Sequence, residues 1–307
     1  MRILITGATG NVGIFLVDKL YSLKHQLYFF TTSLNKLNFF KNKAIGYYWN
    51  PSKDTINSEL LCKIDCIIHL AGSSIAKPWT SSYKKKIFDS RILSTEFLFD
   101  KINAIKNKTK IRKIISASAI GIYPDSSTEF YKENSLTIAN NFIQDLVYKW
   151  ERSVDRFKEI GIKVCKLRIG LVLIKKSGIL KPIELFSKLN IGLVFGDGKQ
   201  FQSWIHIEDL ILIIVFVIEN KLTGIYNCVA PNPVNQKTLT REILLFLTTK
   251  HHIFYMSKKI TRLLMGEMSI LVLDSQNVSS KKIEKNGFIF KYRLIHNAIK
   301  SLYIANK

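Results

Sequence analysis

The chain has 307 residues, of which 47% are hydrophobic, and its formal net charge is +23. This length exceeds that of a typical single domain, and the apolar fraction allows a sizeable core with a smaller second lobe. The longest apolar run, Leu210–Ile218, is too short to span a bilayer and fits a buried helix better. Glycines interrupt the first residues, so the pattern of a secretory signal peptide is absent. We therefore expect a cytoplasmic protein with no membrane partner.

The high positive charge has two interpretations. A nucleic-acid binder carries a clustered basic footprint, and its affinity depends steeply on salt. Here the densest run is only Lys84–Lys86, and lysine, asparagine and isoleucine crowd even the expected loops. We attribute the positive charge to the high lysine content that is typical of proteins from AT-rich genomes, and we expect no nucleic-acid partner. An anionic cofactor or substrate would still benefit from the positive field.

The four cysteines predict neither a metal site nor a disulfide framework. They lack the paired spacing of zinc ligands and are too few for a dense set of bridges. We expect reduced thiols at Cys62, Cys66, Cys165 and Cys228 and no bound metal.

A glycine-rich turn follows the first predicted strand. Ile3–Ile5 is typical of a buried strand, and Ile14–Leu20 has the apolar spacing of a helix. Glycines spaced three apart between them allow a tight turn, close approach to a pyrophosphate and close packing of helix on strand. The helix N-terminus offers free N–H groups to phosphates. We predict a dinucleotide site here, with an ordinary glycine-rich turn as the alternative. The turn residues expected at the cofactor are Gly7, Thr9, Gly10, Asn11, Val12 and Gly13.

The end of the second predicted strand, Gln26–Thr32, indicates which dinucleotide is bound. An acid there would hold the ribose 2′-hydroxyl of NAD, whereas basic or small polar residues accommodate the 2′-phosphate of NADP. The strand ends in Thr31 and Thr32, with Lys36 close behind and no acid until Asp54. We predict NADP as the cofactor. NAD stays open as an alternative because hydroxyls accept either nucleotide.

Further strands alternate with helices along the first two thirds of the chain. This rhythm predicts an α/β protein with a doubly wound parallel sheet, the Rossmann fold. We expect the dinucleotide domain to cover residues 1–172 and a smaller, mostly helical substrate lobe to cover 173–307, with 203–229 packing back on the core. Residues 178–198 contain several glycines, and we expect this segment to be rich in loops. The further strands predicted are Ile45–Tyr48, Asp65–Gly72, Ile111–Ser118, Ile162–Arg168 and Gly224–Val229, and the C-terminal helices lie near 238–249, 258–265 and 294–303.

A long helix is predicted from Thr80 through Arg91 to about Ala104. Its apolar stripe leaves Arg91 free to point elsewhere, either to a phosphate of cofactor or substrate or to solvent. His69 lies inside an apolar strand and is expected to be structural.

Motifs along the whole chain carry a family likeness. They are Gly7–Gly13, His69–Gly72, Asp89–Arg91, Ser116–Ala119, Lys149–Glu151, Arg168–Gly170, Ser203–His206, Ala230–Val234, Gly266–Met268 and Asn286–Phe288. With them the sequence resembles the extended short-chain dehydrogenase/reductases. More narrowly, it resembles the atypical branch called "epimerase family protein", which has a C-terminal domain of unassigned function.

The resemblance implies a nicotinamide-binding domain, usually for NADP, and a substrate lobe built mostly from the C-terminal third. Thr32 stands where the branch commonly has a basic residue, and Lys86 where it commonly has an acid. Besides the glycine turn, the resemblance places cofactor contacts at Thr31, Thr32, Leu70, Ala71, Gly72, Lys86, Arg91 and Val172.

Active short-chain dehydrogenases carry a tyrosine four residues before a lysine on one helix. The lysine lowers the pKa of the tyrosine, which then exchanges a proton with the substrate oxygen. Aligning the predicted helix 140–160 on Glu151 places Ile143 and Val147 in those two positions, and neither can move a proton. Tyr148 and Arg152 have the right spacing but fall on the polar face. We therefore predict that the usual Tyr-x-x-x-Lys relay is missing.

Other side chains are candidates for the chemistry. Ser118 ends a strand and would polarise a carbonyl oxygen, unless its hydroxyl bonds its own backbone. Without the relay, Tyr123 is the best remaining acid. Trp204 and His206 would help line the substrate pocket, with burial against the 210–218 helix as the alternative.

These observations lead to one main functional hypothesis. We expect an NADP-dependent oxidoreductase or epimerase that acts on a small polar or nucleotide-sugar-like substrate. A non-catalytic protein that senses NAD(P) is the alternative. A nucleic-acid binder rests on net charge alone.

Overall fold

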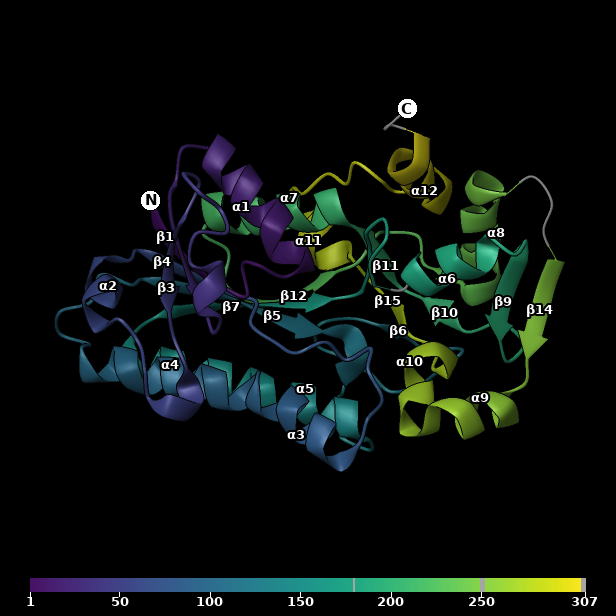
Figure 1. The fold of residues 1–307 in the computed structure, drawn as a ribbon, viewed down its shortest axis with the longest axis horizontal. Coiled ribbons are helices and arrows are strands. Elements are labelled where there is room, and N and C mark those ends of the chain that lie inside the picture. The colour runs from purple at the N-terminus through teal and green to yellow at the C-terminus, as the bar shows by residue number, and fades with distance from the viewer. Residues whose placement is uncertain (179, 249–251, 305–307) are drawn as a thin grey trace.

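The computed structural model describes residues 1–178, 180–248 and 252–304. A seven-stranded parallel sheet forms its centre (Figure 1), with strand order β3-β2-β1-β4-β5-β7-β12. The chain winds outward in both directions from β1 and β4, and ligands of such sheets bind at the carboxyl ends beside this switch point. The strands are β1 (Arg2–Thr6), β2 (Gln26–Thr31), β3 (Ile45–Tyr48), β4 (Cys66–His69), β5 (Lys113–Ala119), β7 (Lys163–Ile169) and β12 (Gly224–Cys228). The predicted Rossmann fold is confirmed.

The glycine turn connects β1 to α1 (Asn11–Ser22). Gly7 has φ +70°, a conformation that favours glycine, and a Cβ there would lie 2.6 Å from the carbonyl oxygen of Leu70. A Cβ at Gly13 would overlap the carbonyl oxygen of Ala8. Two of the three glycines are therefore required by close backbone approach between β1, α1 and the end of β4.

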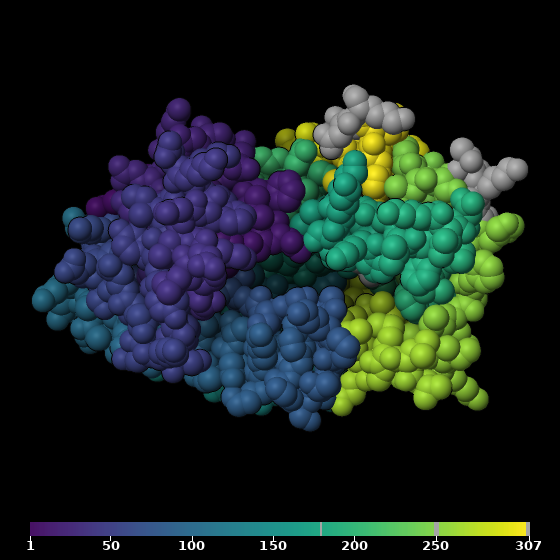
Figure 2. All heavy atoms as spheres, viewed as in Figure 1, coloured from purple at the N-terminus to yellow at the C-terminus, as the bar shows by residue number. Residues whose placement is uncertain are grey.

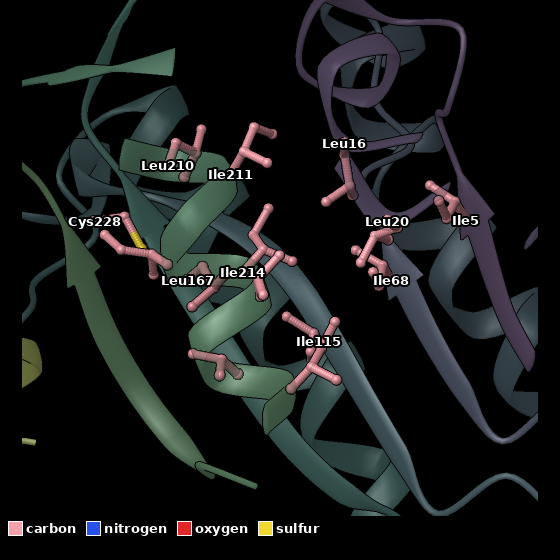
Figure 3. Close-up of a cluster of buried hydrophobic side chains, with 14 of the residues drawn as sticks. Ile5, Leu16, Leu20, Ile68, Ile115, Leu167, Leu210, Ile211, Ile214 and Cys228 are labelled. Atoms are coloured by element: carbon pink, nitrogen blue, oxygen red, sulfur yellow. The ribbon is translucent and has the colours of Figure 1, made fainter. Parts of the chain in front are cut away.

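Helices cover both faces of the sheet. On one face, α1, α7 (Ile207–Glu219) and α11 (Lys281–Lys285) pack on the apolar side chains of the central strands. Figure 3 shows Leu16 and Leu20 of α1 and Ile211 and Ile214 of α7 directed at this layer. The other face is covered by α2 (Ser58–Lys63), α4 (Ile92–Ala104) and α5 (Phe142–Asp155).

The C-terminal residues build a smaller lobe at one end of the sheet, on the right in Figure 1. Its core packs Leu239 and Ile243 against Ala298 and Ile299, with Trp204 beneath them. The lobe contains α6 (Leu180–Ser187), α8 (Gln236–Leu247), α9 (Lys258–Met265), α10 (Ile270–Leu273), α12 (Ile295–Ile304) and the parallel pair β9 (Ile191–Phe195) and β14 (His252–Met256). The helical C-terminal region is thus present, although β12 and α7 lie on the main sheet. The boundary at residue 172 stays a prediction, since segments on both sides of it build one core.

Short elements complete the chain. They are α3 (Ser81–Asp89), the 3₁₀ turns η1 (Leu34–Lys36), η2 (Pro51–Lys53), η3 (Ile120–Ile122), η4 (Arg156–Ile160) and η5 (Gly266–Ser269), and the strands β6 (Phe130–Tyr131), β8 (Leu171–Leu173), β10 (Phe201–Gln202), β11 (Trp204–His206), β13 (Val234–Asn235) and β15 (Asn277–Val278).

Three predictions about elements need correction or restriction. The long helix predicted from Thr80 to Ala104 is two helices, α3 and α4, separated by a turn at Ser90 and Arg91. The Ser90 hydroxyl donates to the Ile87 carbonyl and accepts from the Ser73 N–H, so it competes with a continuous helix. Residues 178–198 hold α6 and β9 rather than loop alone, apart from residue 179, which lies outside the described residues. The predicted helix end at Thr249 also lies outside them.

In the part of the chain that the structure describes, no helix has both the length and the apolar character needed to cross a bilayer.

Candidate active site

A cleft of about 560 Å³ lies at the carboxyl ends of β1, β2 and β4, beside the glycine turn. Figure 2 shows the surface hollowed near the centre of this face, between the purple and blue N-terminal part and the teal segment of the smaller lobe. Seven of the residues predicted to contact the cofactor line this cleft: Gly7, Thr9, Thr31, Thr32, Ala71, Gly72 and Lys86. The walls also include Trp49, Asn50, Ser52 and Leu93.

The remaining predicted cofactor residues lie beside this cleft or in the core. Gly10 is the N-cap of α1. The N–H groups of Asn11, Val12 and Gly13 have no hydrogen-bond partner among the described residues. Such first-turn donors, at the positive end of the helix dipole, form a site for an anion. Leu70 and Val172 pack instead against the core beneath α1 and α7.

Arg91 carries a half-buried charge without a carboxylate partner among the described residues. Its Nη1 donates to the carbonyl oxygens of Ser73 (3.0 Å) and Ile87 (3.3 Å), and its guanidinium lies over the Trp150 ring. A Cβ built at Gly72 would lie 3.0 Å from its Cζ, so the group sits directly on the backbone that follows β4. Burial lowers the pKa of Arg91 to about 10. A cation held this way is stabilised when an anion binds beside it.

The end of β2 offers hydroxyls rather than a carboxylate. Thr31 is buried and its hydroxyl accepts from the Ser33 N–H, whereas Thr32 lines the cleft. The one carboxylate on the cleft wall, Asp89, pairs with Lys85 at 2.6 Å, while Lys86 has no ion-pair partner among the described residues. The cleft therefore presents more positive than negative charge.

A second cavity, of about 180 Å³, lies between the carboxyl ends of β5 and β7 and the smaller lobe. Ile143, in the first turn of α5, forms part of its wall, and a Cβ at Gly121 would lie 2.6 Å from its Cγ2. Val147 is buried one turn further on. The wall is lined by Ile75, Ala119, Ile120, Gly121, Asn141, Ile143, Ile169, Gly170, Leu171, Phe201, Gln202, Ser203, Ile270, Leu271, Asp274 and Gln276.

Ser118 and Tyr123 do not line either cavity, because a buried polar network holds both hydroxyls. Ser118 donates to Glu151 Oε1 at 2.6 Å, and the same carboxylate pairs with Arg168 at 2.8 Å. Tyr123 donates to Asn227 Oδ1 (2.8 Å) and accepts from Arg168 Nη1 (2.9 Å). This geometry favours a structural role for both hydroxyls.

The charges within this network are balanced. Burial acts to raise the pKa of Glu151, but Arg168 and Lys166 outweigh it and keep that pKa below its usual value. Burial raises the pKa of Tyr123, which makes the phenol a reluctant proton donor. Glu151, the residue used to align the helix, is therefore the centre of a buried ion pair.

Trp204 and His206 also lie away from both cavities. Trp204 is fully buried in the core of the smaller lobe and donates to the carbonyl oxygen of Asn232. His206 caps α7 through Nδ1, which accepts from the Glu208 N–H, and packs on Tyr292. The neighbouring Gln202 and Ser203 line the second cavity instead. Both side chains are therefore buried, as the alternative to a role in the substrate pocket expects.

His69 is structural in the way the sequence suggests, but it has partners. Its ring nitrogens lie 2.7 Å from Thr6 Oγ1 and 3.0 Å from Thr95 Oγ1, so it ties β1 and β4 to α4. Burial lowers its pKa to about 4.

Sequence reasoning missed the residues that the C-terminal lobe contributes to the second cavity. Asp274 and Gln276 follow α10, and their place beside β5 and β7 depends on how the lobe folds back. The available signal was a lone acid directly after the apolar run Ile270–Leu273. No group of three or more His, Cys, Asp or Glu side chains in the described ranges could hold a metal ion.

Models of protein families and known relatives match this chain. The model of the "NAD dependent epimerase/dehydratase family" matches residues 3–142, and "Domain of unknown function (DUF1731)" matches 258–302. A Staphylococcus epidermidis protein named "Epimerase family protein" is 36% identical over 98% of both chains. A Staphylococcus aureus protein of the same designation is 36% identical over 97% of this chain and 98% of its own.

Solved structures share the fold. The human epimerase family protein (isoform2) with NADPH has a TM-score of 0.83 at 22% identity and covers 100% of both chains. The nucleoside-diphosphate sugar epimerase from Corynebacterium glutamicum has a TM-score of 0.77 at 28% identity, over 99% of this chain and 58% of that one. The chain therefore belongs to the NAD dependent epimerase/dehydratase family, and within it to the epimerase family proteins.

Proposed function

We propose that the chain binds NADP(H) in the first cleft and uses it to oxidise, reduce or epimerise a small substrate held in the second cavity. The observation that carries this proposal is Arg91, a half-buried cation without a carboxylate partner in the described ranges, seated on the backbone of Gly72 beside the glycine turn. Such a cation fits a phosphate group of the cofactor.

The described residues fit a dinucleotide. The free N–H groups of Asn11, Val12 and Gly13 would hold the pyrophosphate. Thr32 and Lys86 would take the 2′-phosphate, because the described residues of the cleft wall include no unpaired carboxylate to repel it. The NADPH named with the human neighbour supports this choice, whereas other neighbours of the same fold are named with NAD.

The nicotinamide supplies or accepts a hydride when it is bound. The chain's own contribution is to position the substrate and to move a proton. Ile143 and Val147 cannot perform proton transfer at the positions where other short-chain dehydrogenases have tyrosine and lysine. The reaction therefore proceeds without the Tyr-x-x-x-Lys relay.

The second cavity suits the reacting part of a small polar substrate. Asn141, Gln202, Ser203 and Gln276 offer amide and hydroxyl groups to substrate hydroxyls or carbonyls. Neighbours of this fold include nucleotide-sugar epimerases. The cavity wall has no lysine or arginine in the described ranges, so the diphosphate of a nucleotide-sugar would lie outside it.

Calorimetric titration with NADP(H) and NAD(H) tests the cofactor assignment. We expect NADP(H) to bind at least as tightly as NAD(H), and a Gly10→Val variant to lose both because its side chain would meet the pyrophosphate. A clear preference for NAD(H) in the wild-type protein would contradict the proposal.

One observation favours a second candidate function, a non-catalytic sensor of NAD(P). Ser118 and Tyr123 are engaged in the buried network, and the relay positions are apolar. A dehydrogenase and epimerase screen on wild type, Tyr123→Phe and Tyr148→Phe distinguishes the two functions. Cofactor binding without any turnover would favour the sensor, and turnover lost only in Tyr148→Phe would contradict the helix register.

A further inference from the structure

The second cavity has one ionisable side chain on its described walls, Asp274. The other lining residues are aliphatic, aromatic, amide or hydroxyl groups, or glycine. Asp274 follows α10, at the end where the smaller lobe meets the carboxyl ends of β5 and β7. It therefore comes from the C-terminal lobe yet borders the same space as Gly121, Ile143 and Gly170.

The Asp274 carboxyl is not used by the fold. Its backbone N–H donates to the Ile270 carbonyl, but its side chain makes no hydrogen bond or ion pair with any described residue. In the neighbouring buried network, by contrast, two carboxylates have cationic partners: Glu151 pairs with Arg168, and Asp155 with Lys166. A half-buried carboxyl without such a partner is available to a ligand in the cavity.

Two charged groups act on this carboxyl from the surrounding elements. Burial and the negative charge of Asp125 together raise the pKa of Asp274 to about 6, against the opposing positive charge of Arg262 of α9. Asp125 is fixed in place because its Oδ1 accepts the N–H of Ser275 at 2.7 Å. The carboxyl is thus able to both give and take a proton near neutral pH.

We propose that Asp274 exchanges the proton with the substrate oxygen in this cavity, the task for which Ile143 and Val147 offer no group. The inference rests on the function proposed above, and it adds a residue from the C-terminal lobe to the reaction.

In the reducing direction, the carbonyl carbon of the substrate gains a hydride from the reduced nicotinamide and its C=O π bond breaks. The oxygen takes the proton of the Asp274 carboxyl, which becomes a carboxylate and is reprotonated from solvent. In the oxidising direction, the carboxylate accepts the hydroxyl proton of the substrate, and the carbon that carries this hydroxyl gives up a hydride to the oxidised nicotinamide. Reduction is therefore favoured below the pKa of Asp274, and oxidation above it.

The first experiment needs no substrate. Protein carrying ¹³C at the aspartate side-chain carboxyls is titrated by NMR as wild type, Asp274→Asn and Asp125→Asn. We expect one resonance titrating near pH 6, absent in Asp274→Asn and shifted to lower pH in Asp125→Asn. Asparagine at 125 keeps the oxygen that accepts from Ser275 and removes only the charge. A wild type without a resonance in this range would overturn the proposal.

The second experiment measures turnover of NADPH with small aliphatic and cyclic ketones as probes. We expect Asp274→Asn to bind NADPH as wild type does but to lose about a hundredfold or more in turnover, as for loss of a general acid. The pH profile of Asp125→Asn should move to lower pH. Asp100→Asn, on the exposed side of α4, serves as the matched control and should leave both unchanged.

The outcomes separate the two proposals. Equal turnover in wild type and Asp274→Asn overturns the role of Asp274 alone. No turnover in wild type, despite NADPH binding, overturns this role together with the proposed enzymatic function. Thermal unfolding of each variant shows whether a loss reflects misfolding.

Discussion

Arg91 combines structural hydrogen bonds with an uncompensated charge, on which its proposed ligand-binding role rests. It closes the turn between α3 and α4 through the Ser73 and Ile87 carbonyls, yet its charge is not neutralised by any described carboxylate. Neutral carbonyls satisfy its hydrogen bonds without compensating the buried charge. The anion that we propose beside Arg91 would supply this missing compensation.

Removing this charge should weaken cofactor binding. A hydrogen bond to an ionised oxygen contributes about 1.5–3 kcal/mol, so Arg91→Ala should lower NADPH affinity about tenfold or more. Arg91→Lys should lose less, because it keeps the charge but not the planar fork. Calorimetry measures both, with Arg152→Ala, whose guanidinium lies over the exposed Tyr148, as the control. Unchanged affinity in Arg91→Ala would return Arg91 to a purely structural role.

His69 gives the fold a pH dependence. Its pKa is about 4 in the folded protein and about 6.5 in an unfolded chain, so between these values the unfolded state binds more protons. The free energy of unfolding therefore falls as pH drops from 6.5 to 4, by about 3 kcal/mol from this residue. In His69→Gln, which does not titrate, this part of the loss should vanish.

Denaturant unfolding at several pH values measures this effect as a difference between two proteins. At pH 7, His69→Gln should be less stable than wild type because it loses contacts to Thr6 and Thr95. That difference should shrink toward pH 4. Using the difference removes the contribution of His206, whose pKa burial also lowers to about 4. A difference that is constant with pH would show that His69 takes up protons equally in both states.

At the scale of elements, α7 is the helix that binds the C-terminal part of the chain to the sheet. Ile214 lies fully buried between α7 and the central strands (Figure 3). Truncating a buried isoleucine to alanine costs about 2–5 kcal/mol, so Ile214→Ala should destabilise the whole protein by that amount. Leu245→Ala, at an exposed position of α8, should change the free energy of unfolding by less than about 0.5 kcal/mol.

Denaturant unfolding gives both values, and hydrogen exchange locates the effect. If α7 is part of the main core, amide protection in β5 and β7 should fall together with that in α7. Loss of protection confined to the C-terminal lobe would contradict this arrangement.

The sequence predicts elements well where their signal is local. Nearby residues are enough to predict the strand, glycine turn and helix at the N-terminus. They are also enough to predict which segments form parallel strands and where the apolar stripe of α5 lies. The break at Ser90 is not visible in periodicity, because it depends on a hydrogen bond to Ser73. Periodicity likewise does not predict where the side chains of Ser118 and Trp204 point, because tertiary packing decides which neighbour each one contacts.

The candidate site shows the same division. The residues near the glycine turn that we propose as cofactor contacts are placed by one local motif, whereas Asp274 reaches the second cavity only because the C-terminal lobe folds against β5 and β7. Nothing in the run of residues around Asp274 encodes that distant contact.

At the scale of the whole molecule, the two parts of the chain are tied by a polar network as well as by α7. Asn227 of β12 accepts from Tyr123, its backbone N–H donates to Glu133, and its side chain donates to the Ser279 carbonyl. The lobe that would hold the substrate is therefore fixed to the sheet that would hold the cofactor. These hydrogen bonds hold the two cavities in a fixed position relative to each other.

The position of α7 and β12 late in the sequence has a consequence for synthesis. The ribosome completes β7 at Ile169 but adds Cys228, the end of β12, only after a further stretch that takes roughly 3–12 s at 5–20 residues per second. Until α7 has been made, nothing covers the apolar layer formed by Ile115 and Leu167, and until β12 has been added, β7 is an open edge. The nascent chain is thus most prone to aggregate when more than half of it has been made, and emergence of α7 and then of β12 ends that interval.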